Sequence, residues 1–234
     1  MSALLLLAIM ELPTTFLERL QALNVSSTPR VLIVSVADQK LALFVDGAVK
    51  ETWSISTARK GVGQKLDSHQ TPLGLHRVKQ KIGKSAPWGA IFDSRESTGK
   101  KWSPNRGVRL VPSKQGDVGE GGSQEPSTFA KAAADKESEI HPFDKLRTSN
   151  PKSEPDFVTS RIFWLEGLEP GLNCGMDAEG RVVDSYKRYI YIHGTNHEEE
   201  IGKPASLGCI RMANSDVITL FDVVQECDLV WIQE

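Results

Sequence analysis

Apolar and polar residues alternate through residues 31–57, which read VLIVSVADQKLALFVDGAVKETWSIST. A period of two is typical of strands that bury one face. Two polar breaks, Asp38-Gln39 and Asp46-Gly47, divide the segment into three runs. Asp-Gly favours a type I′ turn, in which both central residues take positive φ. The pattern therefore predicts a three-stranded antiparallel meander.

Short apolar runs bounded by turn residues continue along the rest of the chain. They are TPLGLHRVKQKIG from Thr71, AIF near residue 91, RIFWLEG from Arg161, RYIYIHGT from Arg188 and DLVWI from Asp228. Many short strands separated by turns indicate a sandwich or barrel-like core. We therefore predict a mainly β fold, a β-rich member of the α+β class.

One segment near the C-terminus carries a helical pattern. In NSDVITLFDVVQEC, an apolar stripe is formed by Val217, Leu220, Phe221 and Val224. Such spacing is typical of an amphipathic helix with one buried face. Asn214 or Ser215 is placed to cap its first turn.

The first 30 residues allow two interpretations. The run MSALLLLAIM resembles the apolar part of a secretory signal, but no basic residue precedes it and no small-x-small cleavage site follows. The alternative is a short helix whose Leu4, Leu7, Leu12 and Phe16 face inward. Either way, residues 1–30 form an N-terminal extension, and the apolar stretch is too short to span a bilayer.

Residues 113–156 are rich in Gly, Ser, Pro, Lys and Glu and nearly free of large apolar side chains. Such a segment cannot bury enough surface to offset the entropy of ordering it. Strand patterns resume on both sides, so we predict a flexible insertion within one domain that spans residues 31–234.

Composition narrows the class of protein. The chain has 234 residues, of which 39% are hydrophobic and 25% charged, as in ordinary globular domains. Its formal net charge of −2 gives no field that favours nucleic acid or an anionic membrane. Cys174, Cys209 and Cys227 form no CxxC pair and no even-numbered set, which argues against structural zinc and a disulfide framework.

Candidate chemistry is concentrated in IHGTNHEEEIGKPASLGCIRM, where His193 and Cys209 lie sixteen positions apart. A thiol attacks as its thiolate, and a free Cys is only about 3% ionised at neutral pH. A neighbouring imidazole at His193 and the fixed charge of Arg211 would assist ionisation. Backbone amides near Gly208 and Cys209 would stabilise an oxyanion.

Two other interpretations of this stretch stay open on spacing alone. Free cysteines are commonly buried as small apolar groups, and a histidine at a strand end is commonly just hydrogen-bonded. A zinc site through His193 and His197 requires a helix to bring the two rings to one side, and Gly194 after a strand argues against one.

The sequence of this stretch resembles that of the L,D-transpeptidase catalytic domain family (YkuD type). The signature of the family is a histidine in HGT followed by Ser-x-Gly-Cys, an apolar residue and Arg. TPLGLHRV resembles the family's Thr-Pro-x-Gly strand. The resemblance covers about Val31 to Ile232, with 113–156 as an insertion. It implies a β-sandwich domain.

The resemblance also implies roles. Cys209 would be the nucleophile acylated by a peptidoglycan stem peptide, and His193 the general base. The Gly194 carbonyl would orient the imidazole, while Ser206, Gly208 and Arg211 would shape the acyl pocket and oxyanion hole. Arg211 would equally serve to brace the loop through its guanidinium fork.

The expected activity is transfer of a tetrapeptide stem to an amine acceptor, which crosslinks two stems in cell wall biogenesis. This chemistry needs no metal and no organic cofactor. L,D-carboxypeptidase activity, cleavage of another peptide, or an idle wall-binding protein are the alternatives. Leu207 stands where the family often carries histidine, and this departure is one reason to consider an idle wall-binding protein.

The substrate class places the protein in the cell envelope or periplasm, although the N-terminus lacks a convincing export signal. Expected partners are peptidoglycan stem peptides, with no nucleic acid and no integral membrane segment. The sequence carries no indication of oligomeric state.

Overall fold

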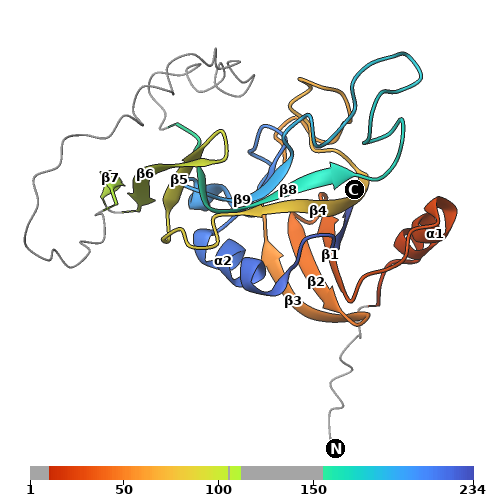
Figure 1. Ribbon diagram of the computed structural model, residues 1–234, viewed down its shortest axis with the longest axis horizontal. Coiled ribbons are helices and arrows are strands. Elements are labelled where there is room, and N and C mark those ends of the chain that lie inside the picture. Colours follow the sequence, from red (N-terminus) through yellow and green to blue (C-terminus); the bar gives the residue numbers. More distant parts are fainter. Residues whose placement is uncertain (1–10, 105, 112–154) are drawn as a thin grey trace, which may run out of the picture.

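The structure is a computed structural model that describes residues 11–104, 106–111 and 155–234 (Figure 1). It confirms the predicted meander as three antiparallel strands, β1 (Arg30–Ser35), β2 (Lys40–Val45) and β3 (Ala48–Ser54). Between β2 and β3, Asp46 and Gly47 have φ of 51° and 82°, as a type I′ turn requires. Local turn chemistry therefore shapes this hairpin as predicted.

The later elements follow the predicted order, and the apolar runs become strands β4, β5, β8, β9 and β11. The remaining elements are α1 (Thr14–Leu23), β4 (Gly74–Ile82), β5 (Ala90–Asp93), β6 (Glu96–Ser103), β7 (Gly107–Leu110), β8 (Val158–Gly167), β9 (Tyr191–Thr195), the 3-10 turn η3 (Glu198–Glu200), β10 (Ile210–Met212), α2 (Asn214–Val223) and β11 (Leu229–Gln233).

Three strands, β6, β7 and β10, have no counterpart in the sequence prediction. Most side chains of β6 and β7 are exposed, so these strands lack the apolar alternation by which a half-buried strand is recognised. Strand β10 is only three residues long. It forms because it pairs with the free edge of β9. This pairing is a tertiary contact, which the local sequence pattern does not reveal.

All eleven strands of the described residues belong to one hydrogen-bonded sheet. Its main order is β3-β2-β1-β11-β4-β8-β5-β6-β7, with β9 also paired to β8 and β10 paired to β9. Two pairs are parallel, β1 with β11 and β9 with β10, whereas the other pairs are antiparallel. The last strand of the chain therefore lies beside the first strand of the meander.

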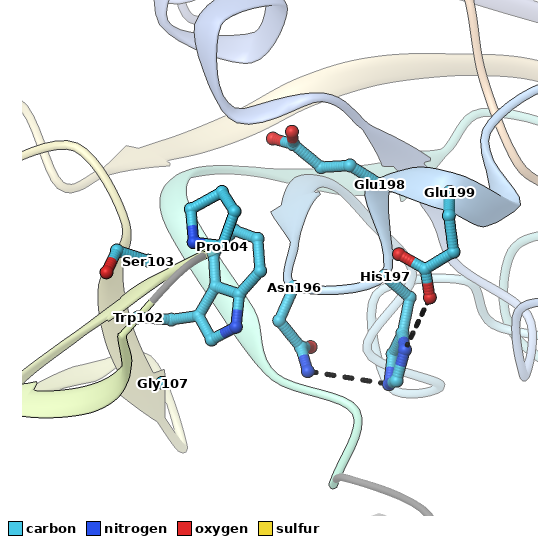
Figure 2. Close-up of a pocket in the computed structure, with 8 residues that line it drawn as sticks. All are labelled: Trp102, Ser103, Pro104, Gly107, Asn196, His197, Glu198 and Glu199. Atoms are coloured by element: carbon cyan, nitrogen blue, oxygen red, sulfur yellow. Dashed lines mark hydrogen bonds and ion pairs between the residues drawn. The ribbon is translucent and has the colours of Figure 1, made fainter.

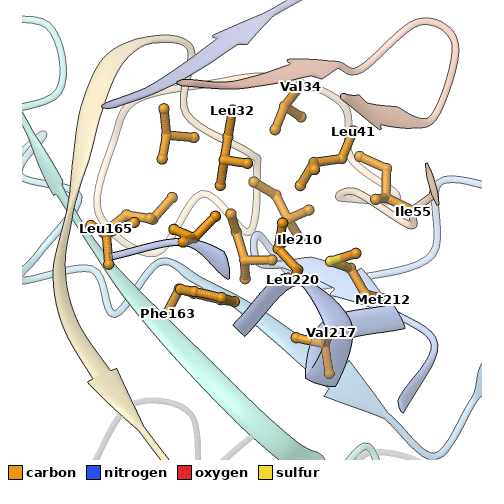
Figure 3. Packing of buried hydrophobic residues seen from close by; sticks show 14 of the residues in the cluster. Leu32, Val34, Leu41, Ile55, Phe163, Leu165, Ile210, Met212, Val217 and Leu220 are labelled. Carbon is orange, nitrogen blue, oxygen red and sulfur yellow. The ribbon is translucent and has the colours of Figure 1, made fainter. Parts of the chain in front are cut away.

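The main core lies between distant parts of this sheet (Figure 3). Leu32 and Leu41 from the meander share a cluster with Ile192 of β9, Ile210 of β10 and Leu220 of α2, and all five are buried. The predicted mainly β fold is confirmed. Its two layers are portions of a single sheet that curls around this core, because strands far apart in the order meet the same side chains.

The opposite face of the meander is covered by α1. Phe16 and Leu20 are buried against Ala42, Phe44 and Trp231, and the rings of Phe16 and Trp231 lie 6.2 Å apart. The helix begins after Pro13, whose fixed φ suits a helix start. The central strands are thus buried on both faces, which explains why β1 and β2 are almost continuously apolar.

The structure leaves two predicted segments outside its described residues. Of the predicted inward-facing leucines, Leu4 and Leu7 fall there, whereas Leu12 packs against the α1 cluster. The predicted insertion at 113–156 also falls there, except for Pro155 and Asp156. Across the described ranges, no helix is long and apolar enough to cross a membrane.

The predicted apolar stripe of α2 is confirmed, since Val217, Leu220, Phe221 and Val224 are all buried in the main core. The predicted cap is wrong. Ala213 occupies the cap position, and its side chain forms no capping hydrogen bond. Instead the Asn214 amide donates to Glu198 Oε1 at 2.7 Å, a contact supplied by η3.

Asn214 has a different function in the fold, because its side chain joins three elements. Its Nδ2 donates to the Thr195 carbonyl of β9 at 2.8 Å, and its Oδ1 accepts from the hydroxyls of Thr159 and Ser160 on β8 at 2.7 and 2.5 Å. The residue is fully buried. Asn214 thus ties α2 to the two strands beneath it.

The docking of α1 depends on its one fully buried ring. We expect Phe16→Ala to lower the free energy of unfolding by about 3 kcal/mol, because it leaves a cavity against the sheet. The adjacent Leu17, 47% exposed, provides the matched control, and Leu17→Ala should change stability by less than about 0.5 kcal/mol. Urea denaturation measures both. Equal effects of the two substitutions would contradict the described packing.

The corrected position of Asn214 gives a second stability prediction. Asn214→Ala should destabilise the protein by about 2–4 kcal/mol, because it leaves two buried hydroxyls and a buried carbonyl without a hydrogen-bond partner. Ser215→Ala, at the exposed neighbouring position, should have little effect. If Ser215→Ala proved the more damaging change in thermal or chemical denaturation, the cap assignment from sequence would stand after all.

Candidate active site

The site is built on the parallel pair of β9 and β10, in which Ile210 lies opposite Ile192 and Arg211 opposite His193. Both isoleucines point into the main core. Since side chains alternate along a strand, His193, Arg211 and the preceding Cys209 project from the other face. His193 lies inside β9, which runs on to Thr195.

All six predicted site residues lie close together in this part of the fold. His193 and Gly194 belong to β9, Arg211 belongs to β10, and the turn that enters β10 contains Ser206, Gly208 and Cys209. This turn is held against residues 56–58, with bridges from Ser56 to Arg211 and from Ala58 to Ser206. A third segment of the chain therefore fixes the position of the cysteine.

The imidazole of His193 has a defined tautomer. Its Nδ1 lies 2.7 Å from the Gly194 carbonyl oxygen. A carbonyl only accepts, so Nδ1 carries the proton and Nε2 of the neutral ring is left as an acceptor. Burial lowers the pKa of His193 to about 4, with Arg211 adding to this effect and Asp156 opposing it. The ring is therefore neutral at physiological pH.

Gly194 can carry no side chain at its position in β9. A Cβ there would lie 2.7 Å from the Thr159 carbonyl oxygen and 2.8 Å from Asn214 Oδ1. The close approach of β8 and α2 thus requires glycine. The same packing holds the Gly194 carbonyl in place, and this carbonyl is the hydrogen-bond partner of the His193 ring.

The Cys209 thiol is 2% exposed, and its Sγ lies 3.4 Å from the Tyr189 carbonyl oxygen, to which it donates. Burial raises the pKa of this thiol to about 12. A backbone hydrogen bond from Tyr191 and the charges of Arg211 and Arg188 oppose the rise without cancelling it. Cys209 and His193 are consequently both neutral at rest, and the site holds no preformed ion pair.

The turn before Cys209 is rigid because Ser206 crosslinks it. Ser206 Oγ donates to the Cys209 carbonyl at 2.6 Å and accepts from the Gly208 amide at 3.2 Å. Gly208 has φ of 129°, which favours glycine, and its carbonyl accepts from Thr71 Oγ1 at 3.1 Å. The Gly208 amide is thus occupied, whereas the Cys209 amide donates to no acceptor in the described part of the chain.

Arg211 is 3% exposed and forms ion pairs with two carboxylates. Its Nη1 lies 2.9 Å from Glu200 Oε2, and its Nη2 contacts Asp156 Oδ2. Its backbone also exchanges two hydrogen bonds with Ser56. Both ends of the guanidinium fork are therefore engaged by the protein, an arrangement suited to bracing the loops around β10.

A second buried arginine, Arg188, was not identified from the sequence. Its guanidinium donates to the carbonyls of Gly63 and Gln70 at 3.2 and 2.7 Å and to Ser68 Oγ at 3.3 Å. Within the described residues no carboxylate forms an ion pair with it. Burial lowers its pKa to about 10. A positive charge that forms no ion pair within the described residues thus lies near Cys209, although Asp67 acts on it from a distance. No local sequence signal marks Arg188.

The other histidine of the motif, His197, lines a pocket whose lining does not include Cys209. Figure 2 shows this pocket of about 270 Å³, lined by Trp102, Ser103, Pro104, Gly107 and residues 196–199. His197 accepts from Asn196 at 3.4 Å and lies 3.3 Å from Glu199. His193 is therefore the motif imidazole that shares a sheet face with Cys209.

His76 lies in β4, the strand with the Thr-Pro-x-Gly pattern, and Leu207 lies two residues before Cys209. His76 is fully buried and bonded to Gly74 and Ser185, with its pKa lowered to about 4 by burial, which fits a packing role. Leu207 is half-buried in the turn before Cys209. It supplies no hydrogen-bonding side chain where the family often has an imidazole.

The chain matches a known family model and, over shorter stretches, several named proteins. A model of the L,D-transpeptidase catalytic domain matches residues 29–232. YqjB of Bacillus subtilis (strain 168), which carries the L,D-transpeptidase name, is 50% identical over 50 residues, or 21% of this chain and 26% of its own. YkuD of the same strain, similarly named, is 55% identical over 38 residues, or 16% of this chain and 23% of its own.

Solved structures give a wider but weaker similarity. An L,D-transpeptidase from Mycobacterium smegmatis has a TM-score of 0.46 and 12% identity, covering 88% of this chain and 59% of its own. L,D-transpeptidase 3 from Mycobacterium tuberculosis, in complex with a faropenem-derived adduct, has a TM-score of 0.47 and 14% identity, covering 88% and 60%.

The matched segments thus span about a quarter of the named Bacillus relatives and about six-tenths of the two mycobacterial chains. The family model covers far more of this chain, from residue 29 to residue 232. The resemblance seen in the sequence is confirmed, and the protein belongs to the L,D-transpeptidase catalytic domain family.

Proposed function

We propose that this protein is a peptidoglycan L,D-transpeptidase in which Cys209 is the nucleophile and His193 the general base. The observation that carries the proposal is the shared face of β9 and β10, onto which both side chains project within a family of L,D-transpeptidase domains. The substrate is the tetrapeptide stem of peptidoglycan, and the reaction belongs in the cell envelope, where that polymer lies.

In the acylation step, Cys209 Sγ attacks the carbonyl carbon of the third stem residue while the thiol proton moves to Nε2 of His193. The amide bond to the fourth residue then breaks, and its nitrogen leaves as an amine with the proton held by His193. A thioester on Cys209 remains. The fixed Nδ1–H bond to Gly194 supports this proton transfer, because it directs the basic nitrogen away from the backbone.

In the second step, an amine of another stem attacks the thioester carbonyl and gives up a proton through His193, and the thiol returns to Cys209. The product is an amide crosslink between two stems. The Cys209 amide is the available donor for the oxyanion in both steps, since the Gly208 amide is bound to Ser206. Water in place of the amine would give L,D-carboxypeptidase activity from the same thioester.

The neutral resting pair determines when the proton moves. Burial raises the thiol pKa and lowers the imidazole pKa, so ionisation before substrate binding is unfavourable. Proton transfer must therefore accompany attack on the carbonyl. The positive charge of Arg188 stabilises the developing negative charge, because no carboxylate among the described residues pairs with it.

The covalent role of Cys209 is tested by substitution. Cys209→Ala should lower crosslinking and carboxypeptidase turnover of a stem tetrapeptide by about 10³-fold or more and abolish the acyl adduct seen by intact-protein mass spectrometry. Cys227→Ser, at an exposed position outside the site, is the matched control and should retain both. Undiminished turnover by Cys209→Ala would exclude the acyl-enzyme proposal.

The neutral resting pair is tested by alkylation. In a protein carrying Cys174→Ser and Cys227→Ser, the rate of Cys209 alkylation by iodoacetamide should rise about tenfold per pH unit from pH 6.5 to 10, because a thiol pKa near 12 lies above that range. A thiolate–imidazolium pair would behave differently. Its rate would reach a plateau near neutral pH, and that result would overturn the proposed timing of proton transfer.

A further inference from the structure

The β5–β6 hairpin turns through two residues that seldom adopt its backbone conformation. Ser94 and Arg95 have φ of 47° and 72°, in the left-handed region that non-glycine residues disfavour. The comparable turn between β2 and β3 uses Asp46-Gly47. Such a conformation persists when other contacts hold it in place, and it directs attention to what the Arg95 side chain does.

The Arg95 side chain lies over an aromatic cluster that we define as Trp164, Tyr186, Tyr189 and Tyr191. Its Cζ lies 4.4 Å from the Trp164 ring centroid and 5.2 Å from that of Tyr189. Its positive charge also acts on the Tyr191 hydroxyl and opposes the rise in the pKa of that group that burial causes. Stacking on two rings fixes the plane and position of the guanidinium.

The aromatic cluster is itself well ordered by ring contacts around Trp164. Tyr186 and Tyr189 stack on Trp164 with centroids 3.9 and 5.6 Å away, and Tyr191 meets it edge-on at 5.8 Å. Trp164 Nε1 donates to the Tyr186 carbonyl at 3.1 Å. Cys209 is buried in the same cluster of side chains. The platform beneath Arg95 is thus a wall of the candidate active site.

Among the described residues, the charge of Arg95 has no acidic partner, in contrast to those of Arg211, Arg30 and Arg77. Arg211 pairs with two carboxylates, and Arg30 and Arg77 with one each. No acidic side chain of the described residues pairs with Arg95, and its Nη1 is buried without a hydrogen-bond partner. A planar fork that stacks on aromatic rings and has no acidic partner in the described ranges is suited to receive a carboxylate.

We propose that Arg95 is a specificity-determining residue that binds a carboxylate of the peptide whose carbonyl is attacked by Cys209. The inference rests on the proposed function. Cys209 and Tyr191 share a buried cluster with Trp164, and Arg95 stacks on the Trp164 ring, so the guanidinium and the thiol adjoin the same group of side chains. Arg95 therefore contacts a part of the peptide away from the reacting carbonyl and contributes to binding.

The test compares Arg95→Gln and Arg95→Lys with the parent protein on three synthetic tetrapeptide stems. One stem has all carboxylates free, one is amidated at the C-terminus, and one is amidated at its side-chain carboxylates. On the free stem, Arg95→Gln should raise KM about 10- to 100-fold with little change in kcat, and Arg95→Lys should restore part of the loss. On the stem that lacks the recognised carboxylate, parent and Arg95→Gln should have equal KM.

The amidated stem on which the difference disappears identifies the terminal or the side-chain carboxylate as the ligand. Arg181→Gln is the control for a general loss of positive charge, because Arg181 lies in a loop and pairs with Asp177 and Glu179. It should leave KM unchanged on every stem. Melting temperatures of all variants establish that the hairpin change leaves the protein folded.

Two results would overturn the inference. The first is a KM on the free stem that Arg95→Gln changes no more than the control does. The second is an equal change in KM on all three stems, which would assign Arg95 to the packing of the hairpin. Failure of the proposed function is distinct, because the parent protein would then turn over none of the stems.

Discussion

The parallel pairing of β9 with β10 is the contact on which the site depends. Two short strands, far apart in the chain, meet in a register that places Arg211 opposite His193. Alternation then directs Ile192 and Ile210 into the core and Cys209 and His193 to the other face. A shift of one residue in β10 would bury Arg211 in the apolar core and expose the isoleucine. Core burial therefore enforces the geometry of the cysteine and the histidine.

That register is secured by contacts that converge from several segments. Asn214 ties the start of α2 to β8 and β9, and the absence of a side chain at Gly194 lets these elements approach. On the other side, Thr71 and Ser206 hold the turn before Cys209. The side chains of Asn214, Thr71 and Ser206 each form hydrogen bonds with buried polar atoms of neighbouring segments. The stability of the fold and the position of the reactive groups consequently rest on the same hydrogen bonds.

Local chemistry explains which parts of the structure could be predicted from sequence. The Asp46-Gly47 turn and the apolar stripe of α2 depend on neighbours within a few residues, and both were predicted correctly. The cap at Asn214 was predicted wrongly because partners on β8 and β9 claim its side chain. Arg188 and Arg95 carried no signal, since their importance comes from the segments that fold around them. The motif identified the family, whereas its electrostatic surroundings required the tertiary structure.

The distribution of charge around the thiol separates two kinds of arginine. Arg211 is neutralised by Glu200 and Asp156, so its guanidinium serves to join loops. Arg188 and Arg95 form no such pair among the described residues: Arg188 donates to backbone carbonyls, and Arg95 stacks on Trp164. Unpaired charges are costly to hold near a buried site unless an anion arrives there. In the reaction that we propose, these two charges meet negative charge that arises on the attacked carbonyl and that the peptide carries.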